Sequence, residues 1–297
     1  MMDWDKLRIF HAVAEAGSFT HAGDRLNLSQ SAVSRQISAL EDGLKVPLFH
    51  RHARGLILTE QGELLYRTAH EVFGKLAMTE AQLTESKDRP KGQLKVTTTV
   101  AFGSIWLAPR IKEFMEIYPK IEVHLILSDR DLDLSMREAD VAVRLSPPRQ
   151  ADLIQRHLLT AHIHIYAAAS YIKNHGMPKS PEDLDNHRIV VYGHDTRPPV
   201  PEVNWLLKIG RSGGSLRTPA LTVNNVYAIM RAVQSGAGIG ALPEFVVSDG
   251  NELVNVLPEL EGPQIDAYFV YPEEVRASKR TAVFRDFLLR KVAESKL

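Results

Sequence analysis

The strongest constraint on the fold of this chain lies near its amino terminus, in residues 29–40. The stretch runs Ser-Gln-Ser-Ala-Val-Ser-Arg-Gln-Ile-Ser-Ala-Leu. Drawn as a helix with about 100° per residue, it places Val33, Ile37 and Leu40 on one narrow apolar stripe, which Leu44 continues. Such a stripe has to be buried, so the segment predicts a helix that packs on one face against its neighbours.

The opposite face of this helix carries short polar side chains. A surface helix normally exposes long charged residues, whereas this one exposes hydroxyl groups and a single arginine, with an amide at its start. Short side chains can form hydrogen bonds inside a groove without blocking close approach, as a DNA recognition helix requires. The candidate DNA-contacting residues of the helix are Gln30, Ser31, Ser34, Arg35 and Ser38.

The residues before this helix supply the rest of a helix-turn-helix unit. Apolar spacing predicts a first helix over residues 4–14, ended by Gly17, and a short second helix over residues 20–26. Residues 27–29 form a tight turn, with Ser29 as the N-cap of the following helix. Helix, tight turn and helix form a DNA-binding supersecondary unit.

The residues after the helix predict a hairpin wing. Two short strands over residues 48–51 and 56–59 are joined through residues 53–55, and Arg51 and Arg54 are placed to grip the DNA backbone. The alternative is a small three-helix subdomain whose polar face is merely solvated. The wing and the placement of its cations favour the DNA-binding interpretation.

Several motifs of this region resemble those of the LysR-type transcriptional regulators. They are FHAVAEAGSFT at 10–20, LSQSAVSRQI at 28–37, LFHR at 48–51 and LTEQG at 58–62. The resemblance spans the whole chain but is very specific only in the first 62 residues. It implies an α/β multi-domain protein: an N-terminal winged helix-turn-helix over residues 1–59, a long linker helix, and a two-lobed α/β effector-binding domain resembling periplasmic binding proteins.

Residues 60–87 predict a long helix that starts after Thr59 as N-cap. Alternating steps of four and three residues give it an apolar seam of coiled-coil type, made of Leu65, Ala69, Val72, Leu76 and Leu83, with Thr79 filling the gap before Leu83. The resemblance implies that this helix mediates dimerisation, and the alternative is a helix packed on its own domain. Proline and glycine in a charged run then predict a hinge at residues 88–92.

Strand and helix patterns alternate over residues 93–297, which indicates parallel α/β architecture. The expected strands are 94–98, 121–127, 141–143, 158–168, 189–192, 239–242 and 266–270, the expected helices 104–118, 132–138, 225–234 and 281–294, and a hairpin is expected at 210–214. The long strand 158–168 and the strand 266–270 would cross between two lobes. Lobe I would comprise about 93–162 and 268–297, and lobe II about 163–267.

Two lobes joined by two crossings leave a cleft, where a small molecule would bind beyond the carboxyl ends of the strands. The candidate effector-binding residues at those ends are Thr99, Val100, Phe102, Ser104, Ser128, Arg144, Tyr192, His194 and Asn224. Arg144 is the only fixed cation among them, which favours an anionic effector. Each of these residues could instead be a cap or a structural hydrogen-bonding group.

Composition limits the remaining function classes. The chain of 297 residues has no cysteine, which excludes disulfides, thiolate zinc sites and a thiol redox sensor. It opens without a basic, apolar leader and has no long uncharged apolar run, so a cytoplasmic protein without a membrane partner is expected. Residues 1–58 carry seven lysines and arginines against six acidic residues, so DNA affinity has to come from local contacts rather than bulk charge.

Three other motifs are rejected as sites. The glycines of Gly236–Gly240 follow a helix and precede a strand, the reverse of a dinucleotide loop. Asp129, Asp131 and Asp133 have calcium-loop spacing but lack the required glycine and glutamate. His162 and His164 share a strand face without a carboxylate motif nearby. No cofactor, metal or catalytic constellation is therefore expected.

The sequence favours a non-enzymatic, sequence-specific transcriptional regulator that acts as a homodimer or homotetramer. Its expected partners are double-stranded promoter DNA and a small-molecule effector, with RNA polymerase as a further candidate. A second interpretation is a metabolite-binding sensor or carrier whose winged helix serves protein contacts. A third, an α/β enzyme with a helical appendage, lacks a catalytic constellation.

Overall fold

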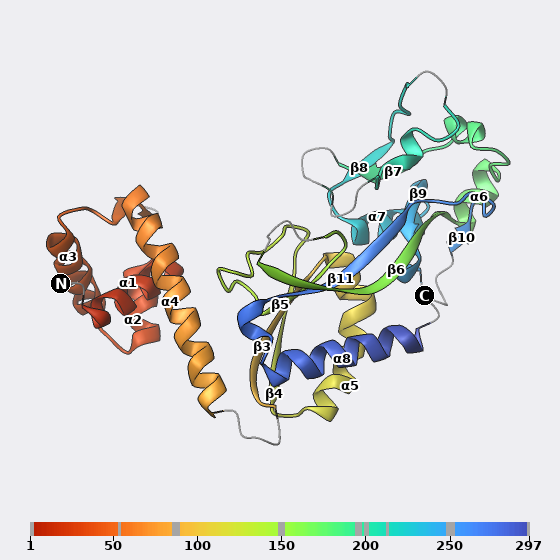
Figure 1. Cartoon of the computed structure of the whole chain (residues 1–297). Helices are drawn as coiled ribbons and strands as arrows, with labels where there is room; N and C mark the ends of the chain where they lie inside the picture. Colours follow the sequence, from red (N-terminus) through yellow and green to blue (C-terminus); the bar gives the residue numbers. More distant parts are fainter. Residues whose placement is uncertain are drawn as a thin grey trace. The chain divides into compact units, whose positions relative to one another are not determined.

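The computed structural model describes residues 3–52, 55–84, 90–147, 152–193, 198, 202–211, 214–247 and 253–295 (Figure 1). The chain divides into two compact units. The N-terminal unit ends at Thr84, and the C-terminal unit holds nearly all of the remaining residues. None of the helices in the described part of the chain is long and apolar enough to cross a lipid bilayer.

The N-terminal unit contains the predicted helix-turn-helix and hairpin. Its elements are α1 (Trp4–Ala16), α2 (Phe19–Leu26), α3 (Gln30–Leu44), β1 (Phe49–His52), β2 (Gly55–Leu58) and α4 (Glu60–Thr84). The predicted caps are confirmed. Gly17 ends α1 in the left-handed conformation with φ of 60°. The Ser29 hydroxyl accepts from the Ala32 N–H at 3.2 Å, and the Thr59 hydroxyl accepts from the Gly62 N–H at 3.0 Å.

The apolar stripe of α3 forms the centre of this unit. Val33 and Ile37 are fully buried and pack with Phe10 and Val13 of α1. The turn before α3 also packs tightly, because a Cβ atom on Gly23 would come within 2.6 Å of the Leu28 carbonyl oxygen. A side chain at that position would force the turn away from α2.

Helix α4 packs against α1 in its first half. Ala69 is 1% exposed, the rings of Trp4 and Phe73 lie 4.9 Å apart, and those of His11 and Tyr66 lie 5.5 Å apart. At Ala69 the seam is buried in the core of its own unit, which agrees with the alternative of a helix packed on its own domain, and dimerisation through α4 stays a prediction. The large apolar residues of α4 that are exposed are Leu64 and Leu76, while the side chain of Leu83 lies outside the described set.

The C-terminal unit is built on one mixed sheet with the order β4-β3-β5-β11-β6-β9-β7-β8, and β10 pairs with β6. The strands are β3 (Gly92–Thr98), β4 (Ile121–Leu127), β5 (Val141–Arg144), β6 (Leu153–Ala168), β7 (Ile189–Tyr192), β8 (Leu221–Val223), β9 (Ile239–Pro243), β10 (Leu253–Asn255) and β11 (Gln264–Pro272). Strands β3, β4 and β5 run parallel, as the alternating pattern predicts.

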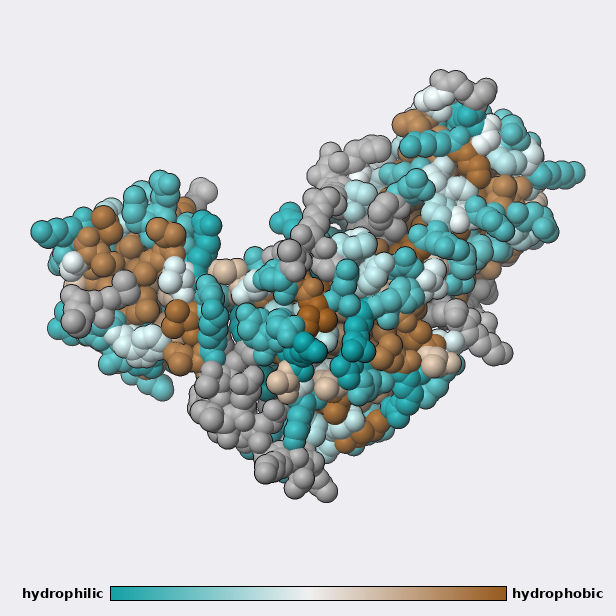
Figure 2. All heavy atoms as spheres, viewed as in Figure 1, coloured by the Kyte–Doolittle hydropathy of each residue, from teal (hydrophilic) through white to brown (hydrophobic). Residues whose placement is uncertain are grey.

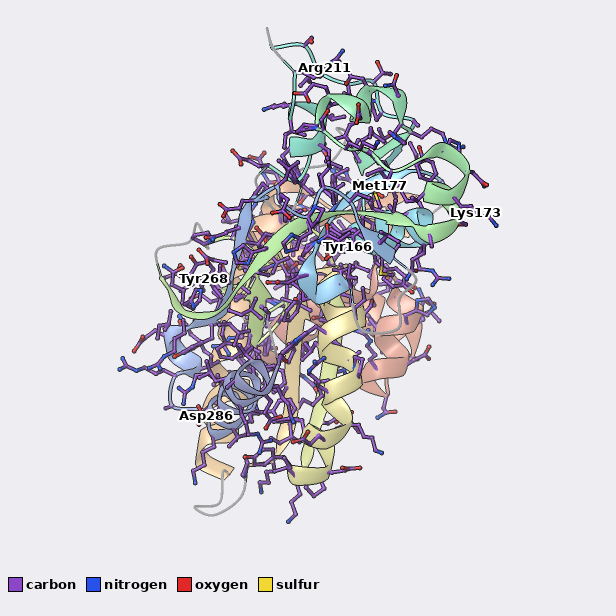
Figure 3. The ribbon with its side chains drawn as sticks, turned by 90° about the vertical axis from the view of Figure 1, so that its right-hand side faces the viewer. Tyr166, Lys173, Met177, Arg211, Tyr268 and Asp286 are labelled. Carbon is purple, nitrogen blue, oxygen red and sulfur yellow. The ribbon has the colours of Figure 1, made fainter. Side chains whose placement is uncertain are left out.

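Two long strands connect the two ends of this sheet. Strand β6 pairs antiparallel with β11 over residues 153–162 and then with β9 over residues 163–166. The expected crossings are therefore present, and they run side by side through the middle of the unit (Figure 1). Figure 3 shows Tyr268 and Tyr166 well separated along this pair of strands, with Lys173 beyond the far end.

Helices cover the sheet on the β3–β4 side. Helix α5 (Ala108–Ile117) follows a π-helical segment (Phe102–Leu107), and α8 (Lys279–Glu294) packs beside it. Phe114 of α5 lies 5.1 Å from Phe284 and 5.2 Å from Phe287 of α8, ring to ring. On the other side of the crossings lie α6 (Ala169–His175) and α7 (Val226–Gln234).

Two expected elements are wrong. Residues 132–138 form no helix, and 134–137 form a turn instead, since seven residues are too few for a stable helix and Arg137 adopts a positive φ of 60°. The described residues around the expected hairpin at 210–214 form turns, and the strand that follows, β8, pairs parallel with β7. The glycine-rich residues 236–240 lead from α7 into β9, the helix-to-strand order that the sequence predicts.

Candidate DNA interface and ligand pocket

Helix α3 presents its polar face to solvent. Gln30, Ser31 and Arg35 are exposed, and Ser34 and Ser38 are half-buried at the edge of that face. The Ser29 and Ser31 hydroxyl oxygens lie 3.1 Å apart at the helix start. The predicted residues thus share one accessible surface on which Arg35 is the only cation, and the exposed Asp42 stands one turn after Ser38 on the same face.

Two further exposed residues of α3 were not predicted. Ala39 follows Arg35 by one helical turn on the same face, and Gln36 borders it. A methyl group such as that of Ala39 can contact a thymine methyl, and a glutamine can pair with adenine. The amphipathic pattern contained both residues, but Ala39 carries no polar group and Gln36 stands beside the apolar stripe, so the pattern did not single them out.

The acidic residue at the end of α3 holds the wing instead of facing the groove. One carboxylate oxygen of Glu41 accepts hydrogen bonds from the Leu48 N–H at 2.7 Å and from the Phe49 N–H at 3.2 Å. This places the start of β1 against the end of α3. It also keeps the negative charge of Glu41 occupied with main-chain donors, away from the exposed polar face.

The wing has the expected hairpin pairing, with Phe49 opposite Leu58 and His52 opposite Gly55. Arg51 belongs to β1, but its side chain, like the whole of Arg54, lies outside the described residues. Their roles as phosphate contacts stay predictions.

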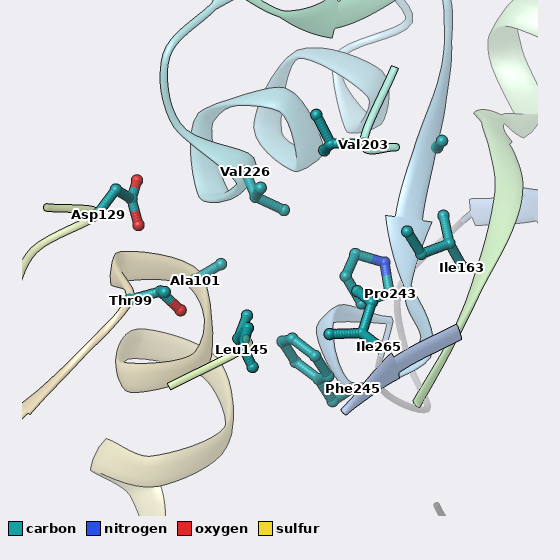
Figure 4. Close-up of a pocket in the computed structure, with 11 residues that line it drawn as sticks. Thr99, Ala101, Asp129, Leu145, Ile163, Val203, Val226, Pro243, Phe245 and Ile265 are labelled. Atoms are coloured by element: carbon teal, nitrogen blue, oxygen red, sulfur yellow. The ribbon is translucent and has the colours of Figure 1, made fainter. Parts of the chain in front are cut away.

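The C-terminal unit contains a pocket between its two lobes (Figure 4). About 350 Å³ of open space lies within and in front of it, and the enclosed part has room for about one water molecule. The described residues that line it are Thr99, Ala101, Asp129, Leu145, Ile163, Val203, Val226, Ala241, Pro243, Phe245 and Ile265. The lining is therefore apolar except for a hydroxyl and a carboxylate, and it includes no arginine or lysine among the described residues.

Asp129 joins the two lobes at one edge of this pocket. One of its carboxylate oxygens accepts from the Val100 N–H at 3.0 Å, and the other accepts from the Asn225 side-chain amide at 2.8 Å. Asn225 is also the N-cap of α7, because its side-chain oxygen accepts from the Ala228 N–H at 3.0 Å. Burial raises the pKa of Asp129, and the two hydrogen bonds oppose that rise.

Thr99 contributes a polar atom without a partner. The residue is 7% exposed, and its buried hydroxyl makes no hydrogen bond within the described part of the chain. A buried hydroxyl without a partner costs free energy. A ligand in the pocket could supply that partner.

The predicted effector residues divide into several groups. Thr99 lines the pocket, and Val100 contributes a main-chain donor to Asp129. Ser104 is half-buried in the π-helical segment, and Asn224 is exposed. The Ser128 hydroxyl bonds to the main chain of Arg130 and so forms a turn.

Phe102 and Tyr192 are core residues, contrary to their prediction as effector contacts. Phe102 is fully buried, with its ring 4.9 Å from that of Trp106 and 5.3 Å from that of Phe245. Tyr192 is 1% exposed, and its main chain exchanges two hydrogen bonds with the Asn204 side chain. His194 lies outside the described residues.

Arg144 does not supply a cation to the pocket. One nitrogen of its guanidinium lies 2.8 Å from the Asp131 carboxylate, and another donates to the Leu132 carbonyl oxygen at 2.8 Å. Its charge is thus offset within the loop after β4. The prediction of an anionic effector depended on this arginine and loses that support.

The sequence did not predict the other pocket residues, because only the folded arrangement of the two lobes brings them together. Asn225 rather than Asn224 faces the other lobe, and Asp129 was considered only as part of a calcium loop. Val226, Phe245 and Ile265 are ordinary apolar residues in the sequence. Only the packing of the two lobes distinguishes them from core residues.

Comparisons with known protein families match both units. Residues 4–63 match the model described as "Bacterial regulatory helix-turn-helix protein, lysR family". Residues 87–293 match the model described as "LysR substrate binding domain". Together the two models cover most of the chain.

Individual proteins align over nearly the full length. The HTH-type transcriptional regulator PtxR of Pseudomonas aeruginosa is 31% identical over 97% of this chain and 92% of its own length. The structure of CrgA, a LysR-type transcriptional regulator from Neisseria meningitidis, matches with 28% identity and a TM-score of 0.61 over 98% of this chain and 99% of that one. The structure of the Vibrio cholerae virulence activator AphB matches with 27% identity and a TM-score of 0.62 over 97% and 99%.

Proposed function

Because this chain belongs to the LysR family of transcriptional regulators, we propose that it regulates transcription by binding a specific DNA site in response to a small molecule held between the lobes of its C-terminal unit. The observation that carries the DNA-binding part is the exposed polar face of α3 on a fully packed helix-turn-helix. Arg35 and the serines beside it are proposed to read base edges in the major groove.

We propose that this interface selects its DNA site mainly through sequence-specific contacts and only weakly through attraction between overall charges. Arg35 is the only cation on the polar face of α3, which also carries Asp42, and the whole of residues 1–58 carries a net charge of only +1. Non-specific binding depends on neutralising phosphates and falls steeply with salt. Cognate binding that persists at physiological salt would therefore depend on hydrogen bonds to bases.

The proposed effector is compact and largely apolar. The pocket lining favours such a ligand, since all but two of its described residues are apolar. Thr99 offers an unpaired hydroxyl, and the Asp129 carboxylate would repel an anion and accept from a donor group. A neutral or donor-bearing ligand is accordingly favoured over a carboxylate.

The proposed active form has two copies of the chain. Leu64 and Leu76 of α4 are 67% and 48% exposed, and apolar (brown) surface is visible on the N-terminal unit in Figure 2. A second α4 helix would cover this surface and place two recognition helices on one DNA site. Light scattering across a range of protein concentrations tests this step, and a strictly monomeric protein would contradict it.

Two experiments test the function. The first selects a duplex from a random pool with the full-length protein, followed by footprinting on the selected sequence. The second screens small neutral, cationic and anionic compounds for an increase in Tm, and repeats footprinting with each hit. A ligand that raises Tm without changing the footprint, together with no sequence preference, would favour the sensor or carrier interpretation.

A further inference from the structure

A cluster of two histidines and a glutamate lies at the packed junction of α1 and α4. His11 Nε2 and His70 Nδ1 are 2.9 Å apart. Glu15 Oε1 lies 3.9 Å from the His11 nitrogen and 4.0 Å from the His70 nitrogen. Among the described residues, this is the one group of three such side chains whose potential ligand atoms all lie within 4.8 Å of one another.

The three ligand atoms lie close enough together to surround one transition-metal ion. For a triangle with sides of 2.9, 3.9 and 4.0 Å, the point equidistant from the corners lies about 2.1 Å from each of them. Zinc–nitrogen and zinc–oxygen bonds to histidine and carboxylate ligands are about 2.0–2.2 Å long. In a four-coordinate site with bonds of this length the ligand atoms are about 3.4 Å apart, so each of the three separations would change by about 0.5 Å.

We propose that His11, Glu15 and His70 bind one divalent transition-metal ion of the zinc class, which links the helix-turn-helix to the linker helix. Two imidazoles and one carboxylate are a donor set that zinc uses in proteins, with water at the remaining position. The two ring nitrogens now share a hydrogen bond over 2.9 Å. A metal ion would replace this hydrogen bond, and the shared proton would move to another ring nitrogen or to solvent.

The surroundings favour metal binding over a simple ion pair. The two histidine side chains are 16% and 17% exposed, and the His11 ring packs against Tyr66 and Phe73. The second oxygen of Glu15 lies 3.4 Å from the Arg25 guanidinium, which orients the carboxylate.

The ligands come from two helices that are distant in sequence, so the ion would hold α1 and α4 together. His11 and Glu15 stand one turn apart on α1, and His70 stands on α4. Binding would stabilise the packing of α4 on the helix-turn-helix, in proportion to the metal concentration. The site would thereby make the geometry of the DNA-binding unit responsive to metal supply.

The test uses the full-length protein, stripped with a chelator and titrated with zinc chloride against a chromophoric competitor. We expect one ion per chain. His70→Gln and His11→Gln should each weaken binding by more than about tenfold. His21→Gln in the exposed part of α2, and His124→Gln beside Glu122, are the matched controls and should leave binding unchanged.

A second readout excludes a purely structural effect of the substitutions. Cobalt should give the d–d absorption of a four-coordinate site in the wild type and lose it in Glu15→Gln, which retains both histidines. Zinc should also raise the Tm reported by Trp4, the only tryptophan of the N-terminal unit. Equal zinc affinity in wild type and His70→Gln, or loss of binding in His124→Gln or His162→Gln instead, would overturn the proposal.

Discussion

Helix α3 presents its candidate DNA-contacting residues from one continuous segment, whereas the pocket of the C-terminal unit collects side chains from β6, β9, α7 and several loops. On α3 the predicted residues lie at or beside the surface, and most predicted pocket residues lie elsewhere. A helix fixes which side chains share a face through its own period. A pocket between lobes has no such period, so its lining depends on how distant segments pack.

The largest expected effect concerns Phe102, which the sequence places in the pocket and the structure places in the core. Phe102→Ala should lower the free energy of unfolding of the C-terminal unit by about 3–5 kcal/mol, because the cavity loses contacts with Trp106 and Phe245. Urea unfolding followed by circular dichroism measures this. The exposed Met115→Ala on nearby α5 should change it by less than about 0.5 kcal/mol. If Phe102→Ala left the stability unchanged and abolished ligand binding, Phe102 would be a ligand contact and not a core residue.

The next effect concerns the α3 face. Arg35→Ala should weaken binding to the selected duplex by about 1–3 kcal/mol and relax the preference for its sequence, since one bidentate base contact is lost. Fluorescence anisotropy on selected and scrambled duplexes measures both. Arg8→Ala, an exposed arginine of α1 paired with Asp5, serves as the control. An equal loss on both duplexes would make Arg35 a phosphate contact.

A smaller effect is expected at the hydrogen bond between the lobes. Asn225→Ser retains an N-cap for α7 but is too short to reach Asp129, so only the 2.8 Å bond is lost. The Tm of the C-terminal unit should fall by an amount that corresponds to about 1 kcal/mol. The exposed Asn224→Ser is the matched control. No difference between these two variants would mean that the bond contributes nothing to lobe closure.

The smallest expected effect concerns the pH dependence of stability, which should differ between the two units. Burial lowers the pKa of His11 below 6.5, so its contribution to stability is present above pH 6.5 and is lost as pH falls through the lowered value. Burial raises the pKa of Asp129 above 3.8, so its contribution is lost as pH rises through the raised value. The two units should respond in opposite directions.

Trp4 reports the N-terminal unit when Trp106 and Trp205 are replaced by phenylalanine. In chelator-containing buffer, its Tm should fall as the pH drops below 6.5, and His11→Gln should reduce that fall. With Asp129→Asn, the C-terminal unit should lose less stability than the wild type as the pH rises above 4. A change of the same sign in both units would contradict the assignment of either group.

Local sequence signals predicted most of the elements. The start of α3 at Ser29, the hairpin, the start of α4 after Thr59, strands β4 and β7, and the crossing strands all agree with the structure within a few residues. These signals are caps, periodicity and apolar runs, which act between residues close in the chain. The expected helix at 132–138 and hairpin at 210–214 failed because polar residues in short segments are compatible with many turn conformations.

The sequence by itself determined that this chain has an amphipathic recognition helix with a short polar face, a hairpin after it and an α/β unit behind a linker helix, because those features depend on the spacing of neighbouring residues. Only the tertiary structure decided which face of α4 its own unit covers, that Asp131 offsets Arg144, that Asn225 reaches Asp129, and that His11, Glu15 and His70 converge. Each of these depends on side chains that are distant in the chain and meet only when the helices and strands pack.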